Sequence, residues 1–490
     1  MASQLRGALE LTRTAELRLD WLATGDQRYE FTCWLLNKSP RATTIITCRR
    51  RVAGGRFVGS HPAQGLELAK GKLCALYCGR TWVDEEIETL RRRSATFHEK
   101  TPYVTDLCPP ARIASYHDFR KTPANLSEVL AELRSQRVQC FKIATQCNSY
   151  ADALRVLSLC KGRRNVIAVP MGEIGLPARV LALKHGSALA YAAVGEKTAP
   201  GQLTLEEMKH LYRADKLDRR SRVYGVIGNP VAHSLSPLLH NTGFIARRMN
   251  DVYLPFLVPD LRDFLRAVAP LRIHGFSVTL PHKQAVLRHL DDCDPLAAAI
   301  GAVNTVVVRG NGTLYGYNTD YVGVLRALQQ RVALRGSRVL IYGAGGAARA
   351  VAFALAQAGA IVNICARRAA EARRLARAAG GQAIERRHLR REFFDAIVNA
   401  TPVGMHPRMA QSPLNATELN CRLLFDSIYR PLQTRLLQLA ERRGIATISG
   451  IEMFIAQGAA QWEIWTGLRA PEKQMRAAVL AKLRAEGKTK

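Results

Sequence analysis

A glycine-rich turn between an apolar run and an alanine-rich stretch constrains the fold of this chain more than any other feature. The run Val339–Tyr342 leads directly into Gly343-Ala344-Gly345-Gly346-Ala347, and the helical pattern Ala350–Ala358 and a further apolar run, Ile361–Ala366, follow. Glycines in this context permit a tight turn that brings backbone N–H groups close to a pyrophosphate at a helix N-terminus. We therefore expect a dinucleotide-binding Rossmann unit here.

Two arginines occupy the place where such a unit normally recognises the ribose of its cofactor. Enzymes that use NAD place an Asp or Glu roughly 20 residues after the glycines, where the carboxylate holds the ribose 2′-OH. This chain has Ala366-Arg367-Arg368 there instead. Because guanidinium groups grip phosphate through paired hydrogen bonds, Arg367 and Arg368 favour a 2′-phosphate. We expect NADP as the cofactor; the alternative is that both arginines are only solvated.

The length and the charge of the chain limit the remaining possibilities. At 490 residues, two to four domains of roughly 100–200 residues each are expected. A net charge of +31 raises the question of nucleic-acid binding. However, the basic residues are spread through amphipathic stretches such as Arg367–Arg377 and Arg386–Arg391, as on solvated helix faces. We expect a basic surface that attracts anionic metabolites and no nucleic-acid partner.

The cysteines and the apolar segments indicate a cytoplasmic enzyme. Eleven cysteines in a chain of this length, none of them in a C-x-x-C pair, predict reduced thiols rather than a disulfide framework. The sequence starts without a signal-peptide pattern. Its most apolar region, Val339–Ala366, is interrupted by glycines and by Arg349, so no membrane segment is expected. No metal site is expected either.

Four polar motifs upstream of the glycine-rich turn each follow an apolar run. They are His233–Pro237, Ser277–Lys283, Gly301–Thr305 and Asn318–Asp320. Reduction of a ketone needs a proton donor beside the forming alkoxide, and a lysine held by a carboxylate can supply that proton. We therefore predict Lys283 and Asp320 as the acid/base pair, although singly they could be a surface lysine and a helix N-cap. Paired seryl hydroxyls are suited to holding a substrate carboxylate.

The order and spacing of these motifs resemble shikimate dehydrogenase across nearly all of Tyr224–Ala485. Further matching motifs are Asn399–Met405, Asp426–Pro431 and Gly450–Gln457. The resemblance implies that Lys283 and Asp320 handle the proton and that Ser234 and Ser236 bind the substrate carboxylate. Other implied substrate-binding residues are Thr279, Asn304, Tyr429 and Gln457. Implied cofactor-binding residues are Gly343, Ala344, Gly345, Gly346, Ala347, Arg367, Arg368, Thr401, Met405, Gly450 and Met453.

The first half of the chain alternates short β-rich runs with helical patterns, which is typical of βα repeats and a parallel sheet or barrel. After these repeats, Leu203–Leu217 has a charged helical pattern and leads into a linker at Asp218–Arg222. The β-rich runs are Ala15–Asp20, Thr44–Cys48, Arg112–Tyr116, Val138–Ala144, Val166–Val169 and Ala188–Ala192.

Lys142 stands inside one of these apolar runs, where burial would lower its pKa and free its amine to attack a ketone. The iminium that results withdraws electrons, so a neighbouring C–H becomes acidic enough for His117 to remove the proton. This is the logic of β-elimination through a Schiff base. On residue types alone, the simpler interpretation is that a lysine in a strand pairs with a carboxylate.

The first half resembles type I 3-dehydroquinate dehydratase, a (β/α)₈ barrel, over about Thr14–Leu217. The resemblance implies that Lys142 is the Schiff-base lysine and His117 the general acid/base. The implied substrate-binding residues are Glu16, Arg18, Arg49, Arg179 and Gln202, with Asp84 as a further acid that lines the site. Two departures stand out: Ala53 replaces the glutamate that orients the histidine in the family, and only 15 residues precede Glu16. Barrel closure at the N-terminus is therefore left open.

Together the two resemblances imply a bifunctional α/β enzyme of aromatic-amino-acid biosynthesis, in which the product of the first reaction is the substrate of the second. The expected domains are a barrel at 1–217, a substrate-binding domain at 222–325, a Rossmann NADP-binding domain at 326–450 and C-terminal helices at 451–490 that pack back on the substrate domain. The alternatives are a shikimate or quinate dehydrogenase with a weak or inactive dehydratase half, a regulator built from inactive copies of these domains, and a nucleic-acid binder.

Overall fold

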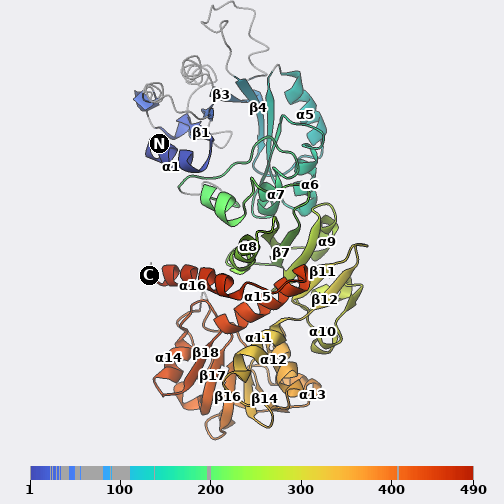
Figure 1. The fold of residues 1–490 in the computed structure, drawn as a ribbon, viewed down its shortest axis with the longest axis vertical. Coiled ribbons are helices and arrows are strands. Elements are labelled where there is room, and N and C mark those ends of the chain that lie inside the picture. The colour runs from blue at the N-terminus through green and yellow to red at the C-terminus, as the bar shows by residue number, and fades with distance from the viewer. Residues whose placement is uncertain are drawn as a thin grey trace, which may run out of the picture. The chain divides into compact units, whose positions relative to one another are not determined.

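The computed structural model describes residues 2–22, 24, 26–28, 30–31, 34, 43–49, 56, 81–88, 90, 111–136, 138–195, 200–405 and 408–488. The chain forms two compact units, which are described separately below (Figure 1). The first consists of Met1–Ser221 and Arg262–Pro270, and the second of Arg222–Leu261 and Leu271–Lys490.

The first unit is built on a sheet of six parallel strands that pair in sequence order. These strands are β1 (Thr14–Arg18), β2 (Thr43–Thr47), β3 (Thr81–Glu86), β4 (Ala111–Asp118), β5 (Cys140–Gln146) and β6 (Val166–Met171). The helices described in this unit are α1 (Ala2–Leu11), η1 (Leu19–Trp21), α5 (Leu126–Ser135), α6 (Tyr150–Ser158), α7 (Leu176–Leu181), η3 (Glu207–Leu211) and α9 (Leu261–Val268), the last from Arg262 onward.

Both faces of this sheet are buried, as in other parallel sheets whose crossovers cover them. Ile45, Ile113 and Ile167 contribute to one apolar cluster, and Ile46 and Val83 belong to another that includes the helix α1. Consecutive strands pair in parallel, and the helices α5 and α6 lie in the connections from β4 to β5 and from β5 to β6, which is the arrangement of a (β/α)₈ barrel. The described residues supply six of its strands.

Three local predictions for the first unit differ from the structure. Ala188–Ala192 is not a strand, and the pairing comes one residue later as a single bridge from Ala193 to Thr204. Alanines have weak β propensity, so this run lacks the branched side chains that favour a strand. Leu203–Leu217 contains only a short helix around η3. The strand β3 was absent from the predicted runs because three of its six residues are acidic.

The second unit begins with a mixed six-stranded sheet in the order β10-β12-β11-β9-β7-β8. Strands β7, β8 and β9 are parallel, while β11 runs antiparallel to both of its neighbours. The strands are β7 (Val223–Gly228), β8 (Val252–Leu257), β9 (Ile273–Val278), β10 (Asp292–Cys293), β11 (Thr305–Val308) and β12 (Leu314–Tyr317). The helices here are α8 (Ser236–Ala246), η4 (Ala285–His289), α10 (Pro295–Ile300) and α11 (Asp320–Gln329).

A second sheet in this unit is entirely parallel, with the order β15-β14-β13-β16-β17-β18. Numbered from its own first strand this is 3-2-1-4-5-6, the order of a dinucleotide-binding fold, so the predicted Rossmann unit is confirmed. Its strands are β13 (Arg338–Tyr342), β14 (Ile361–Cys365), β15 (Gln382–Ala383), β16 (Phe394–Asn399), β17 (Cys421–Asp426) and β18 (Ala446–Ser449). Its helices are α12 (Gly346–Gln357), α13 (Ala369–Ala378), η5 (Arg386–His388), η6 (Ala416–Glu418) and α14 (Arg435–Glu441).

Two C-terminal helices, α15 (Ile451–Thr466) and α16 (Glu472–Lys488), return to the first sheet of this unit (Figure 1). Phe454 and Trp462 of α15 share a buried cluster with Tyr224 of β7 and Phe244 of α8. This packing brings one face of α15 against β9 and β11. Across the described parts of the chain, we find no helix with the length and apolar character needed to span a membrane.

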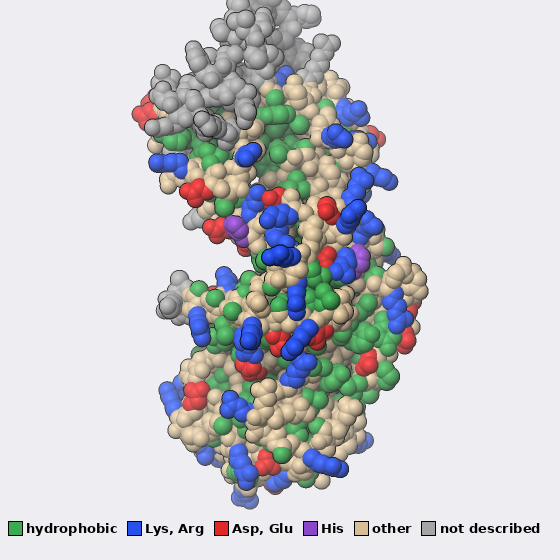
Figure 2. All heavy atoms as spheres, in the orientation of Figure 1, with side chains coloured by type: hydrophobic (Ala, Val, Ile, Leu, Met, Phe, Trp, Pro, Cys, Tyr) green, Lys and Arg blue, Asp and Glu red, His purple; other side chains and the backbone are tan. Residues whose placement is uncertain are grey.

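On the face shown in Figure 2, Lys and Arg side chains lie over both units, with Asp and Glu side chains among them. This distribution agrees with the net charge of +31 and with basic residues that lie on solvated faces.

Candidate active sites

The glycine-rich turn of the Rossmann sheet lies at the point where the strand order reverses, between β13 and β16. Gly343 follows β13 with a φ of 131°, and a Cβ there would lie 2.9 Å from the carbonyl oxygen of Ala400. A side chain would therefore be both strained and crowded at this position. Helix α12 begins at Gly346, no described side chain caps it, and a Cβ on Gly345 would meet nothing within 4 Å. Backbone N–H groups in open space at a helix start fit a pyrophosphate.

The other predicted cofactor residues come from the carboxyl ends of neighbouring strands. Arg367 and Arg368 follow β14 and are exposed, and Met405 is also exposed. Thr401 follows β16, and its hydroxyl donates to Asn399 Oδ1 over 2.7 Å. Gly450 and Met453 stand at the start of α15. Strand ends at the switch point are where open α/β sheets bind their ligands.

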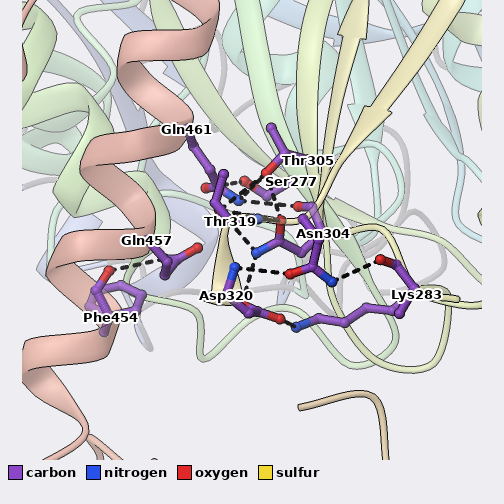
Figure 3. A network of polar contacts seen from close by, with 11 residues as sticks. Ser277, Lys283, Asn304, Thr305, Thr319, Asp320, Phe454, Gln457 and Gln461 are labelled. Carbon is purple, nitrogen blue, oxygen red and sulfur yellow. Dashed lines mark hydrogen bonds and ion pairs between the residues drawn. The ribbon is translucent and has the colours of Figure 1, made fainter. Parts of the chain in front are cut away.

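Lys283 and Asp320 form an ion pair in which Nζ lies 2.5 Å from Oδ2 (Figure 3). Lys283 follows the end of β9 after a short turn, and Asp320 is the first residue of α11. Their side chains are 18% and 7% exposed, so the contact is largely shielded from solvent. The pair stands beside the cofactor turn, because a Cβ placed on Gly346 would lie 3.8 Å from Lys283 Cδ.

Asn304 holds the second oxygen of the Asp320 carboxylate. Its Nδ2 donates to Asp320 Oδ1 over 2.8 Å, and its Oδ1 accepts from the backbone N–H of Thr319 over 2.7 Å. Val303, the residue before Asn304, contacts Lys283 as well: its N–H donates a hydrogen bond to the carbonyl oxygen of Lys283 over 2.8 Å. Lys283, Asn304 and Asp320 are therefore one connected group (Figure 3).

The other predicted substrate residues have no hydrogen bond to this group among the described residues. Ser234 Oγ accepts from the N–H of Ser236, the first residue of α8, over 3.2 Å. Thr279 follows β9, and its N–H donates to the Ile227 carbonyl. Gln457 projects from α15 toward the Asn304 group in Figure 3, while its Nε2 donates to Phe454 O over 3.0 Å.

Tyr429 is the remaining predicted substrate residue of the second unit. It follows β17 and stacks on Phe454 of α15 with 4.3 Å between ring centroids. Burial raises the pKa of its phenol to about 12, so the group is a hydroxyl donor at neutral pH.

Gln461 was not predicted from the sequence, yet it contacts Asn304 and Thr305 directly. It is buried on α15 one turn after Gln457. That spacing of four residues puts both glutamines on one helix face, which is the signal that could have found it.

In the first unit, Lys142 lies on β5 with both of its neighbours in the strand buried. Its Nζ donates to Asp84 Oδ2 of β3 over 2.7 Å and lies 4.0 Å from Glu16 Oε2 of β1. Arg49 also reaches Asp84, with 3.3 Å between Nη2 and Oδ2. Strands far apart in sequence thus bring two carboxylates and a guanidinium around one buried lysine.

His117 lies on β4, the strand next to that of Lys142. Its Nε2 is buried and accepts or donates no hydrogen bond within the described part of the chain. Burial lowers the pKa of His117 well below 6.5, and the nearby cations Arg49, Lys142 and Arg18 lower it further. The imidazole is therefore neutral at pH 7 and can act as a base. Ala53, the predicted departure beside it, lies outside the described residues.

The other predicted residues of the first unit differ in their contacts. Arg179 of α7 is buried, its Nε has no hydrogen-bond partner in the part of the chain that the structure describes, and burial lowers the pKa of its guanidinium to about 10. Arg18 donates twice to Asp20, over 2.8 and 2.7 Å, so it is held beside β1. Gln202 is half-buried in the segment after the bridge at Ala193.

Tyr191 was not predicted as a site residue. Its ring centroid lies 4.2 Å from Lys142 Nζ, and its buried hydroxyl has no hydrogen-bond partner among the described residues. Glu16, Asp84, His117, Arg179 and Tyr191 each have a buried polar atom that makes no hydrogen bond to another described residue, so these atoms are available to a polar ligand.

The chain is similar to known proteins along its length. Residues 1–219 match type I 3-dehydroquinase, 226–306 the shikimate dehydrogenase substrate binding domain, and 450–480 the shikimate 5′-dehydrogenase C-terminal domain. The shikimate dehydrogenase (NADP(+)) of Bacillus anthracis is 41% identical over 274 residues, which cover 54% of this chain and 99% of the relative. A solved structure of a shikimate dehydrogenase in complex with NADP⁺ is 36% identical with a TM-score of 0.51, and covers 55% of this chain and 97% of its own.

A further relative spans both units. The chloroplastic bifunctional 3-dehydroquinate dehydratase/shikimate dehydrogenase of Arabidopsis thaliana is 34% identical over 482 residues, which cover 94% of this chain and 78% of the relative. Because the match extends over most of both proteins, the chain belongs to the family of bifunctional 3-dehydroquinate dehydratase/shikimate dehydrogenases.

Proposed function

We propose that this chain catalyses two consecutive reactions: dehydration of 3-dehydroquinate to 3-dehydroshikimate, and reduction of that product to shikimate with NADPH. The observation that carries the proposal is the ion pair between Lys283 and Asp320 beside a glycine-rich turn built for a dinucleotide. The family of the chain supplies the substrates. A second buried lysine, Lys142, lies beside Asp84 in the first unit and provides an amine for the dehydration.

In the reduction of the ketone of 3-dehydroshikimate, NADPH held at the glycine-rich turn would supply the hydride, and the residues of this chain handle the proton. Lys283 Nζ gives a proton to the carbonyl oxygen as charge develops there, and Asp320 keeps the ammonium in place. Ser234 and Ser236 hold the substrate carboxylate. Thr279, Asn304, Tyr429 and Gln457 bind the hydroxyls.

The cofactor is held by the turn from Gly343 to Ala347, with Arg367 and Arg368 at the 2′-phosphate. The support is the left-handed φ of Gly343, the open space at Gly345 and the exposed guanidiniums after β14. Thr401, Met405, Gly450 and Met453 complete the predicted contacts.

In the dehydration, the amine of Lys142 attacks the ketone of 3-dehydroquinate, and loss of water leaves an iminium. Neutral His117 removes a proton from the carbon next to the iminium and returns it to the departing hydroxyl, so water is the leaving group. Hydrolysis of the iminium then releases 3-dehydroshikimate and restores Lys142. Arg179 meets the substrate carboxylate, and Glu16, Arg18, Arg49 and Gln202 bind the rest of the molecule.

A coupled assay tests both reactions at once. Purified protein given 3-dehydroquinate and NADPH is expected to oxidise NADPH, and Lys142→Ala is expected to abolish this while retaining reduction of added 3-dehydroshikimate. Borohydride should trap substrate on Lys142. Lys283→Ala and Asp320→Asn should slow reduction about 100-fold or more, the contribution of a positioned acid/base. Unchanged rates in these two variants would remove the pair from the mechanism.

A dehydrogenase with a weak or inactive dehydratase half is the second candidate, and it rests on Ala53 and the unpaired Nε2 of His117. It predicts normal oxidation of shikimate or quinate but no borohydride adduct on Lys142. Rates with quinate and shikimate, each with NADP and NAD, decide between the two dehydrogenase substrates.

We also propose a cytoplasmic location with small molecules as the only partners, and neither nucleic acid nor membrane. Support comes from Cys140, Cys147, Cys160, Cys293, Cys365 and Cys421, none of which forms a disulfide with another described residue. Cell fractionation tests the location. A DNA mobility shift at physiological ionic strength would contradict the absence of a nucleic-acid partner.

A further inference from the structure

Gln461 connects helix α15 to strand β11, which begins at Thr305, the last residue of the predicted motif Gly301–Thr305. Its side chain is buried, and the residue is only 2% exposed. Its Oε1 accepts from Ser277 Oγ over 2.7 Å, while its Nε2 donates to Asn304 O over 3.1 Å and to Thr305 Oγ1 over 3.0 Å (Figure 3). All the polar atoms of the amide are therefore engaged by residues next to the Lys283–Asp320 pair.

Backbone groups fix which way each amide in this network faces. The carbonyl of Asn304 can only accept, so it selects Nε2 of Gln461 and leaves Oε1 facing Ser277. Ser277 must then donate to Gln461, and it accepts from the hydroxyl of Tyr253 over 2.6 Å. In the same way the N–H of Thr319 can only donate, so Oδ1 of Asn304 faces it and Nδ2 faces Asp320.

The hydrogen bonds consequently run in one direction toward Asp320. Gln461 donates to the hydroxyl of Thr305, which donates to Asn304 Oδ1 over 2.7 Å. Asn304 donates to one oxygen of Asp320, and Lys283 donates to the other. In such an ordered chain each bond polarises the next, and in a buried setting a missing member leaves the others unsatisfied.

We propose that Gln461 is a positioning residue for the reduction, acting through Asn304. It holds the backbone carbonyl of Asn304 and the hydroxyl of Thr305, so the amide of Asn304 keeps its N–H group on Asp320 and the carboxylate stays aligned with Lys283. Gln461 has no contact with Lys283 or Asp320, and its role rests on the proposed function of that pair.

A double-mutant cycle tests whether Gln461 acts through Asn304. The variants Gln461→Met, Asn304→Ala and the double variant are compared by kcat/KM for shikimate oxidation with NADP. We expect Gln461→Met to lower kcat/KM about 10- to 100-fold, the scale of a lost buried hydrogen bond, and to leave the Kd for NADP unchanged. In the Asn304→Ala background the same change should cost less than twofold, because a shared pathway makes the effects non-additive.

Trp465→Phe is the matched control. Trp465 lies one turn further along α15, is also buried, and donates from Nε1 to Val306 O of the same strand over 3.0 Å. The variant therefore loses one hydrogen bond between α15 and β11 but keeps the series of hydrogen bonds from Gln461 to Asp320. We expect it to lower the unfolding midpoint and to leave kcat/KM within about twofold of the wild type.

Three outcomes overturn the proposal: full kcat/KM in Gln461→Met, additive effects in the cycle, or an equal loss of activity in Trp465→Phe. If Gln461→Met fails to fold, Thr305→Val cuts the link between Gln461 and Asn304 Oδ1 and is put through the same cycle. Failure of the proposed function is seen separately, as a wild-type protein without shikimate oxidation. Dehydration of 3-dehydroquinate by the first unit should continue in every variant.

Discussion

The ammonium of Lys142 lies 2.7 Å from Asp84 Oδ2, and the two side chains are 4% and 1% exposed. Burial alone would raise the pKa of Asp84, but the charges of Lys142 and then Arg49 outweigh it, so the pKa lies below its ordinary value. Asp84 is therefore an ionised, buried partner that keeps the amine of Lys142 in place before substrate arrives.

We expect Asp84→Asn to destabilise the first unit at neutral pH by up to about 3–5 kcal/mol, because it removes the nearer of the two carboxylates around the buried Lys142 and leaves Glu16 at 4.0 Å. A carboxyl whose folded pKa is lowered stabilises the fold above its unfolded pKa of about 3.9 and loses that contribution as pH falls through the folded value. The difference between wild type and variant should thus shrink below pH 4. Urea unfolding from pH 7 to pH 3 measures it, and a constant difference would contradict this assignment.

Arg179→Met is expected to separate stability from activity in the first unit. Arg179 is buried, and its Nε has no hydrogen-bond partner among the described residues, so its removal should raise the unfolding midpoint of the protein without substrate. A hydrogen bond to a charged group contributes about 1.5–3 kcal/mol, so kcat/KM for 3-dehydroquinate should fall about 10- to 100-fold or more. Arg155→Met, on the half-exposed pair with Asp152, is the control and should keep normal dehydratase activity. An active Arg179→Met enzyme would remove this residue from the site.

The sequence identified the dehydrogenase half well because its chemistry is concentrated in short motifs. The strand from Arg338 to Tyr342 lies within one residue of the predicted run, and Lys283 and Asp320 lie in two of the predicted motifs. The contacts of Gln461 could not be predicted in this way. From sequence alone, a glutamine on an apolar helix is expected to face solvent. Its contacts become clear only when the strand packed against the helix is known, and the partner residue, Thr305, is 156 residues away in the sequence.

The first half shows a different limit. Lys142 and Asp84 are 58 residues apart, and only the parallel pairing of β3, β4 and β5 brings them together. The strand β3 itself was not predicted, because three consecutive acidic residues do not show the apolar pattern of a buried strand. In the structure, Glu85 pairs with Arg112 and Asp84 pairs with Lys142. In a sequence, acidic residues that form ion pairs with neighbouring strands cannot be told apart from residues that face solvent.

Arg367→Ala is expected to change cofactor preference rather than overall activity. Loss of the guanidinium at the predicted 2′-phosphate site should raise the KM for NADP about tenfold or more and leave the KM for NAD nearly unchanged. Arg377→Ala, exposed in the last turn of α13, is the matched control for surface charge. Initial rates with both cofactors at saturating shikimate measure the effect. Equal losses with NADP and NAD would mean that Arg367 does not recognise the phosphate.

His240 provides a prediction for the acid stability of the second unit. It is fully buried on α8, it stacks on Tyr253 with 4.3 Å between ring centroids, and the side chain of Gln461 on α15 is its polar neighbour, which raises the pKa less than burial lowers it. Burial lowers the pKa of its imidazole to about 3. The unfolded chain therefore binds a proton between pH 6.5 and pH 3 that the folded chain does not, and the fold is destabilised as pH falls through this window.

His240→Phe keeps an aromatic ring in this position and removes the titration. Relative to the wild type, its free energy of unfolding should rise by about 1.4 kcal/mol for each pH unit below 6.5, until the difference levels off near pH 3. Trp465→Phe changes the same aromatic cluster without removing an imidazole, so its difference from the wild type should not vary with pH over this range. Urea unfolding at half-unit steps measures both slopes. A parallel pH dependence of His240→Phe and wild type would show that His240 takes up its proton without unfolding, and that its surroundings admit water.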